Sequence, residues 1–104
     1  MTDATARLSS WARSVVVDTV LAYRRSMGEQ PESSVAYRAA RDAFIGAGGD
    51  AELAPHEVPR IIGAASQEHS DWFWRPANER IAQEERRKAR DVWPLPINRR
   101  EGPA

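Results

Sequence analysis

The sequence of 104 residues contains no cysteine. Disulfide bonds, thiolate nucleophiles and cysteine-ligated zinc are therefore excluded together. The chain also lacks a long apolar run, because the stretch 15–23 is interrupted by Asp18 and is too short to span a bilayer. The first 23 residues show no clear small-residue cleavage site, and Asp3 and Asp18 argue against a transit peptide. We expect a cytoplasmic protein that is used without processing and does not enter a membrane.

An excess of either charge is also missing, since 15 basic and 15 acidic side chains give a formal net charge of zero. The distribution is uneven: residues 75–100 carry eight basic against four acidic side chains, whereas residues 1–74 carry seven against ten. Lys88 is the single lysine, so nearly every cation is an arginine. High-GC bacterial coding produces the same bias, so the arginine preference alone is weak evidence for phosphate chemistry.

Length and composition predict one folded domain. A chain of 104 residues with 41% hydrophobic and 29% charged residues can bury a modest core and is too short for a multi-domain enzyme. The pattern predicts an all-α fold, a small single domain of three core helices plus a charged C-terminal helix and an extended proline-containing tail. The helical domain is expected to cover residues 1–92 and the tail residues 93–104.

Two long helices are predicted in the first half of the chain. From Ala4 to Met27 apolar residues recur at steps of three and four, and no glycine or proline interrupts this range. One face of the predicted helix carries Leu8, Trp11, Val15, Thr19 and Ala22. A second helix is expected from Pro31 to Ala47, before the glycine-rich turn. Its inward residues would be Val35, Ala39, Ala40, Ala43 and Phe44.

Two further helices are predicted in the second half. A short one over residues 59–69 would bury Ile61, Ile62 and Ala65, with Pro55 or Pro59 in a first turn. After a turn at residues 70–74, Pro76 would restart the chain as a helix over residues 76–92. That helix is polar on nearly every face and would be supported by weak pairs such as Glu84 with Lys88 and Arg87 with Asp91.

Three stretches of the sequence resemble chemical motifs, but each lacks residues that its motif requires. The loop 44–58 has the rhythm of a calcium-binding EF-hand, but Gly46 and Gly48 stand where oxygen ligands are needed. A metal or acid–base cluster could draw on His56, Glu57, Glu68, His69 and Asp71, although their spacing matches no ligand signature. Ser66 lacks the context of a nucleophile elbow. We therefore predict no catalytic, cofactor-binding or metal-binding residue.

A helix-turn-helix is a further interpretation of residues 35–69. The glycine turn is longer than usual, and the second helix offers only Arg60, Gln67 and His69 to a DNA groove. Simple core helices are the favoured interpretation of this region.

The C-terminal third is the best candidate for a binding surface. Arginines with aromatic neighbours suit either an acidic protein surface or phosphate groups, and the prolines at 94 and 96 favour an extended apolar ligand at residues 92–97. The predicted partner-binding residues are Trp72, Trp74, Arg75, Arg80, Arg86, Arg87, Arg90, Trp93 and Leu95. The favoured function is a non-enzymatic interaction module, a regulator, accessory subunit or inhibitor, with a protein partner. A nucleic-acid-binding regulator is the alternative, and self-association stays open because the first helix is apolar over a broad face.

The aromatic trio Trp72, Phe73 and Trp74 sits at the junction of these two parts. On a helix the three rings would point about 100° apart, so they cannot all face one small core. We expect Phe73 and one tryptophan to close the core against Ile61, Ile62 and Trp11. The remaining tryptophan would meet the basic helix or a partner.

Overall fold

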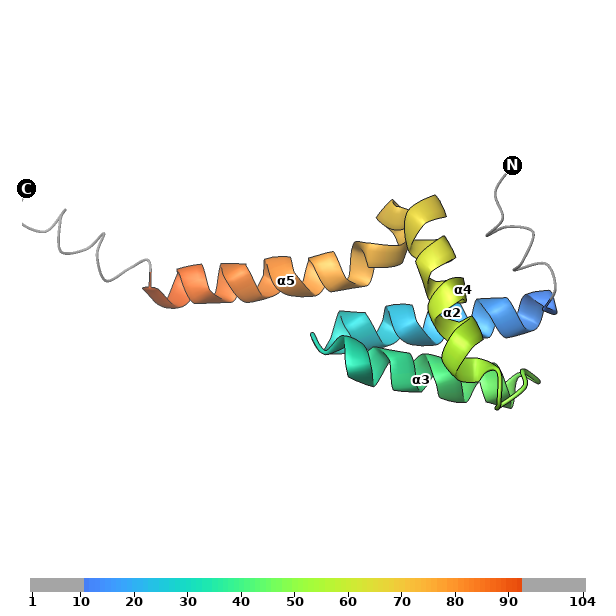
Figure 1. The fold of residues 1–104 in the computed structure, drawn as a ribbon. Coiled ribbons are helices and arrows are strands. Elements are labelled where there is room, and N and C mark those ends of the chain that lie inside the picture. Colours follow the sequence, from blue (N-terminus) through green and yellow to red (C-terminus); the bar gives the residue numbers. More distant parts are fainter. Residues whose placement is uncertain (1–10, 93–104) are drawn as a thin grey trace, which may run out of the picture.

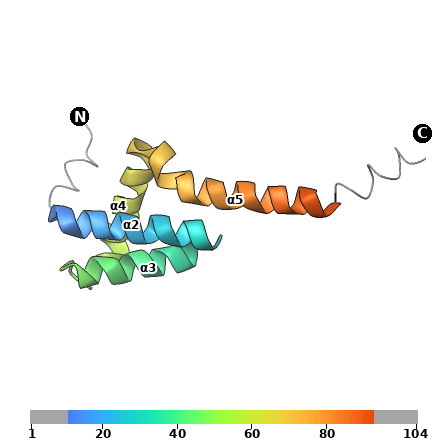
Figure 2. The same cartoon turned by 180° about the vertical axis from the view of Figure 1, so that it is seen from behind.

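The computed structural model describes residues 11–92 and confirms the all-α fold class. Within this range there are four helices and no strand: α2 (Arg13–Glu29), α3 (Ser33–Gly46), α4 (Ala54–Glu68) and α5 (Ser70–Val92). Figure 1 shows α2 and α3 as an antiparallel hairpin that α4 crosses, while α5 runs out beyond the other three. Seen from behind, the same projecting helix leaves the body next to α2 (Figure 2). None of the helices in residues 11–92 combines the length and apolarity that a bilayer crossing needs.

Helix α2 supplies the central face of the core. Val15 and Thr19 are buried, as predicted, whereas the predicted Ala22 is half-buried and its neighbour Tyr23 is buried. The Thr19 hydroxyl donates to the Val15 carbonyl at 2.7 Å. This local bond lets a polar side chain lie in the core without an outside partner. The helix begins at Arg13, so Trp11 precedes it, and residues 4–10 of the predicted helix lie outside the described range.

The buried face of α3 agrees with the prediction in part. Ala36, Ala40 and Phe44 are fully buried, whereas Val35 is 38% exposed. Small side chains at 36 and 40 let α2 and α3 approach closely, so the larger Val35 is left at the edge of the contact. The fully buried residues recur every four positions and include the predicted Ala40 and Phe44. The predicted Ala39 and Ala43 are half-buried.

The turn after α3 requires glycine at two positions. Gly48 has a φ of 114°, a conformation that favours glycine. Gly49 lies against the Phe44 ring so closely that a Cβ there would overlap the ring. Asp50 then accepts a hydrogen bond from the Glu52 amide at 2.8 Å, which leads the chain into α4.

Helix α4 is longer than predicted. It begins at Ala54, so Pro55 lies in its first turn as expected, but Pro59 lies inside the helix. Pro59 has no N–H to donate to the carbonyl of Pro55, four residues earlier. Because Pro55 is exposed, water can donate to that carbonyl instead. The predicted core residues Ile61, Ile62 and Ala65 are confirmed as buried.

Helix α5 corrects the prediction of a turn followed by a restart at Pro76. Residues 70–92 form one helix with Pro76 inside it. The missing Pro76 N–H leaves the Trp72 carbonyl without its usual helical donor, and Arg24 Nε of α2 donates to that oxygen at 2.9 Å instead. Figure 1 shows α5 bending close to its beginning, as an internal proline would cause.

Candidate functional site

The aromatic trio divides between core and surface. Phe73 is 1% exposed and stacks on Tyr23 with ring centroids 5.6 Å apart. Trp74 is half-buried, with its ring edge-on to Phe73 at 4.9 Å. The expectation that Phe73 and one tryptophan close the core is confirmed. Trp11 does not stack with them, because its ring meets Phe44 at 5.0 Å.

Trp72 is the member of the trio that faces solvent. Its side chain is 38% exposed, and the Arg24 guanidinium carbon lies 4.2 Å from the centre of its ring. Arg24 therefore makes both a cation–π contact with the Trp72 ring and a hydrogen bond to the Trp72 carbonyl. These two contacts fix an exposed tryptophan in place, so it is presented as a rigid surface.

An apolar groove of about 350 Å³ adjoins Trp72. It lies between α2, the end of α4 and the start of α5, and we call it the α2–Trp72 groove. Its lining residues are Val16, Val17, Val20, Leu21, Ala65, Glu68, His69 and Trp72. Val17 is 42% exposed, so part of the groove wall is open to water. Exposed apolar surface of this kind marks a contact site more often than a lone exposed residue does.

Sequence reasoning missed this groove, although it noted the breadth of the apolar face of α2. Val15 turns towards the core, while Val16 and Val17 follow at about 100° steps and reach the opposite side of the helix. Three consecutive valines within a helix were the available signal. The sequence could not show the second wall of the groove, which His69, between α4 and α5, and Trp72 of α5 supply.

The predicted arginines have different surroundings. Arg80 is half-buried and its Nε donates to the Met27 carbonyl at 3.0 Å, so it caps the C-terminal end of α2. Arg75, Arg86 and Arg90 are exposed. Arg87 lies 3.6 Å from Glu84, so that pair replaces the predicted one between Glu84 and Lys88. Trp93 and Leu95 lie outside the described residues.

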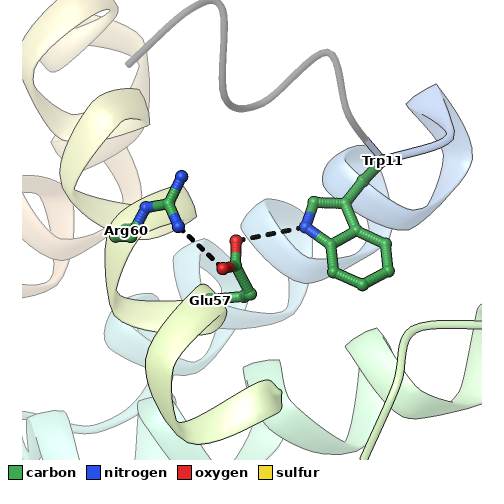
Figure 3. A network of polar contacts seen from close by, with 3 residues as sticks. All are labelled: Trp11, Glu57 and Arg60. Atoms are coloured by element: carbon green, nitrogen blue, oxygen red, sulfur yellow. Dashed lines mark hydrogen bonds and ion pairs between the residues drawn. The ribbon is translucent and has the colours of Figure 1, made fainter. Parts of the chain in front are cut away.

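Glu57, a candidate calcium or metal ligand, has both carboxylate oxygens engaged. Trp11 Nε1 donates to one oxygen at 3.2 Å and Arg60 donates to the other at 2.7 Å (Figure 3). This network joins Trp11, just before α2, to α4, and it also engages Arg60, one of the residues considered for contact with a DNA groove. No group of three or more potential metal ligands occurs within residues 11–92.

Ser66 likewise has a structural bond. Its hydroxyl donates to the Gly63 carbonyl at 2.9 Å within α4, as helical serines commonly do. The structure therefore gives the hydroxyl a partner within its own helix.

Comparisons with protein-family models, with curated proteins and with solved structures found no match for this chain. Its function must therefore be argued from its own surface, where the α2–Trp72 groove and the exposed arginines of α5 are the outstanding features.

Proposed function

We propose that this chain is a non-enzymatic protein-interaction module that binds a protein partner through its aromatic and arginine-rich C-terminal third. The observation that supports this most directly is Trp72, which is 38% exposed beside an apolar groove of about 350 Å³. Tryptophan and arginine are the residues most enriched at the energetic centres of protein interfaces. A groove of this kind takes an apolar side chain of a partner, and nearby arginines fix its orientation.

The distribution of charge along α5 supports a protein partner over a phosphate backbone. Arg80 already caps α2, and Arg87 forms an ion pair with Glu84. Acidic residues interrupt the remaining cations at 79, 84, 85 and 91. A phosphate backbone favours an uninterrupted positive surface, whereas a protein surface can match mixed charges. The apolar groove has no role in phosphate binding.

Affinity capture from host cells, with mass spectrometry, tests the proposal. The variant Val17→Glu places a charge in the groove, and Val35→Glu is its matched control because Val35 is a similarly exposed helical valine on α3. We expect one partner to be retained by the wild-type chain and by V35E and to be lost with V17E. Equal capture by all three chains would show that the groove is not the binding site.

The nucleic-acid alternative is tested separately with a labelled random duplex at low and moderate salt. We expect no measurable binding at low salt. Binding that falls steeply with salt, is abolished by the triple change R86Q, R87Q and R90Q, and is unaffected by V17E would replace the protein-partner proposal.

A further inference from the structure

A cleft of about 290 Å³ lies between α3 and the first half of α4 and shares no lining residue with the α2–Trp72 groove. We call it the α3–α4 cleft. Its α3 wall is formed by Ser34, Tyr37, Arg38 and Arg41, which recur at steps of three and four and so lie on one face of the helix. None of the described residues that line it is acidic. The cleft therefore presents two positive charges, although residues 1–74 as a whole carry seven basic against ten acidic side chains.

Arg38 and Arg41 have no ionic or hydrogen-bonding partner within residues 11–92. The ion pairs and side-chain hydrogen bonds of arginine in this range come from other arginines. Asp42 is next to Arg41 in the sequence, but it does not line the cleft and pairs with neither arginine. At three-residue spacing the Cβ atoms of Arg38 and Arg41 are about 5–6 Å apart. The two guanidinium groups therefore repel each other and can both reach one anion.

A second polar cleft, between the end of α2 and α5, shows the opposite arrangement. Its lining includes Glu29 and Glu84 as well as Arg80 and Arg87, so its charges are balanced. Arg80 already donates to the Met27 carbonyl, and Arg87 pairs with Glu84. The α3–α4 cleft thus differs from it in having arginines that are not engaged by the protein.

The opposite wall of the α3–α4 cleft is apolar. Helix α4 supplies Val58, which is buried, and the exposed rings of Pro55 and Pro59. On the α3 side the Tyr37 ring is held edge-on against the buried Tyr23, with ring centroids 4.8 Å apart, so this part of the wall is formed before any ligand binds. Cations on one wall and apolar side chains on the other suit a ligand that has an anionic group and an apolar body.

We propose that the α3–α4 cleft binds a small phosphate monoester, with the phosphate group on Arg38 and Arg41 and the apolar body against Val58 and the two prolines. A phosphate monoester carries about 1.5–2 negative charges at pH 7, which match two guanidinium groups better than the single charge of a carboxylate does. Arginine also binds phosphate oxygens through two parallel hydrogen bonds. A volume of about 290 Å³ is close to the lower end of the range of small-molecule sites. The site is separate from the proposed protein-binding groove and does not depend on it.

Isothermal titration calorimetry of the full chain with phenyl phosphate at low salt tests the site. We expect the wild-type chain to bind and R38Q and R41Q each to weaken binding about tenfold or more, because each loses a charge-assisted contact. R86Q, which removes an exposed arginine of α5, is the control and should bind as the wild type does. No measurable binding by the wild-type chain, or equal losses in all three variants, would overturn the proposal.

Two adjacent serines provide a sharper pair of variants. Ser34 lines the cleft one turn before Arg38, whereas Ser33, the first residue of α3, does not line it. Both serines are exposed, and glutamate is favourable in the first turn of a helix, so S33E and S34E should both fold. The two variants have the same net charge, but only S34E places a carboxylate where it can pair with Arg38 four residues later. We expect S34E to lose phenyl phosphate and S33E to retain it, and equal binding by the two would contradict the site.

Further probes test the class of ligand. Inorganic phosphate should bind several-fold more weakly than phenyl phosphate because it lacks the ring, and benzoate should bind more weakly because it carries one charge. If either probe binds as tightly as phenyl phosphate, the proposed ligand class is wrong. A phosphotyrosine peptide that binds more than about tenfold more tightly than phenyl phosphate, and is lost with R38Q, would replace the small molecule with a protein partner. V17E should bind phenyl phosphate normally, so this result is independent of the capture experiment.

Discussion

Gly28 and Gly63 both lie inside helices, but only Gly28 has a close neighbour. A Cβ on Gly28 would lie 2.6 Å from the Pro76 Cβ of α5, whereas a Cβ on Gly63 would meet nothing within 4 Å. Helix propensity favours alanine over glycine by about 1 kcal/mol at both positions. The close contact between α2 and α5 therefore requires glycine at position 28, because a side chain there would push the helices apart.

We predict opposite effects of the same substitution at these two positions. Gly63→Ala should stabilise the protein by about 0.5–1 kcal/mol, because alanine has the higher helix propensity and its Cβ would meet no neighbour. Gly28→Ala should destabilise it by about 1–2 kcal/mol, because overpacking exceeds the propensity gain. Urea unfolding monitored by circular dichroism measures both values. A stabilised G28A would mean that α5 does not pack against the end of α2.

Tyr23 links stability to alkaline pH. Burial raises the pKa of Tyr23 above its ordinary value of 10.0, and the charge of Tyr37 and a hydrogen bond with it raise the pKa further. The fold thus favours the neutral phenol. The contribution of neutral Tyr23 to folding stability is present in full below pH 10.0. It is lost as the pH rises through the higher pKa that Tyr23 has in the folded state.

The stability of the wild-type chain should therefore fall more steeply above about pH 10 than that of Tyr23→Phe, because phenylalanine cannot ionise. Urea unfolding at a series of pH values from neutral to alkaline compares the two chains. Parallel curves over that range would show that the ionisation of Tyr23 is not linked to unfolding.

At the scale of the helix, Pro76 and Arg24 form a compensating pair. Pro76 removes the donor for the Trp72 carbonyl, and Arg24 supplies another at 2.9 Å while its guanidinium covers the Trp72 ring. Arg24→Met should cost about 1–2 kcal/mol in the wild-type chain. In a Pro76→Ala background the alanine N–H can bond the carbonyl, so the same change should cost about half as much.

A double-mutant cycle measured by urea unfolding gives this coupling. Arg25→Met is the control for Arg24, because Arg25 is an exposed neighbour on α2 and its loss should change stability by less than about 0.5 kcal/mol. Equal costs of R24M in the two backgrounds would contradict the compensation.

This pair also explains where prediction from the sequence failed. A proline normally ends or restarts a helix, and nothing near Pro76 in the sequence indicates a donor 52 residues away in Arg24. The apolar spacing of α2 and the core of α4 were predictable because they depend on local periodicity. The α2–Trp72 groove and the cap that Arg80 provides for α2 were not, because each depends on how two helices far apart in sequence pack together.

At the scale of the molecule, the core is one continuous cluster. It includes Phe44 at the end of α3 and Phe73 at the start of α5, and it contains residues of all four helices. Trp11 packs on Phe44, while Trp74 packs on Phe73, so tryptophan side chains lie beside both ends of the cluster. A single core of this kind predicts that residues 11–92 unfold in one cooperative transition.

Phe44→Leu and Phe73→Leu should then have similar effects although they lie at opposite ends. Each should lower stability by about 1–2 kcal/mol and the midpoint temperature by roughly 4–15 °C, because each leaves a small void in a closed core. Far-UV circular dichroism follows all the helices, and tryptophan fluorescence follows the two ends of the cluster. We expect the two signals to coincide in the wild-type chain and in both variants. If F73L instead shifts the fluorescence transition ahead of the helical one, α5 is a separate unit that docks on a core formed by α2, α3 and α4 alone.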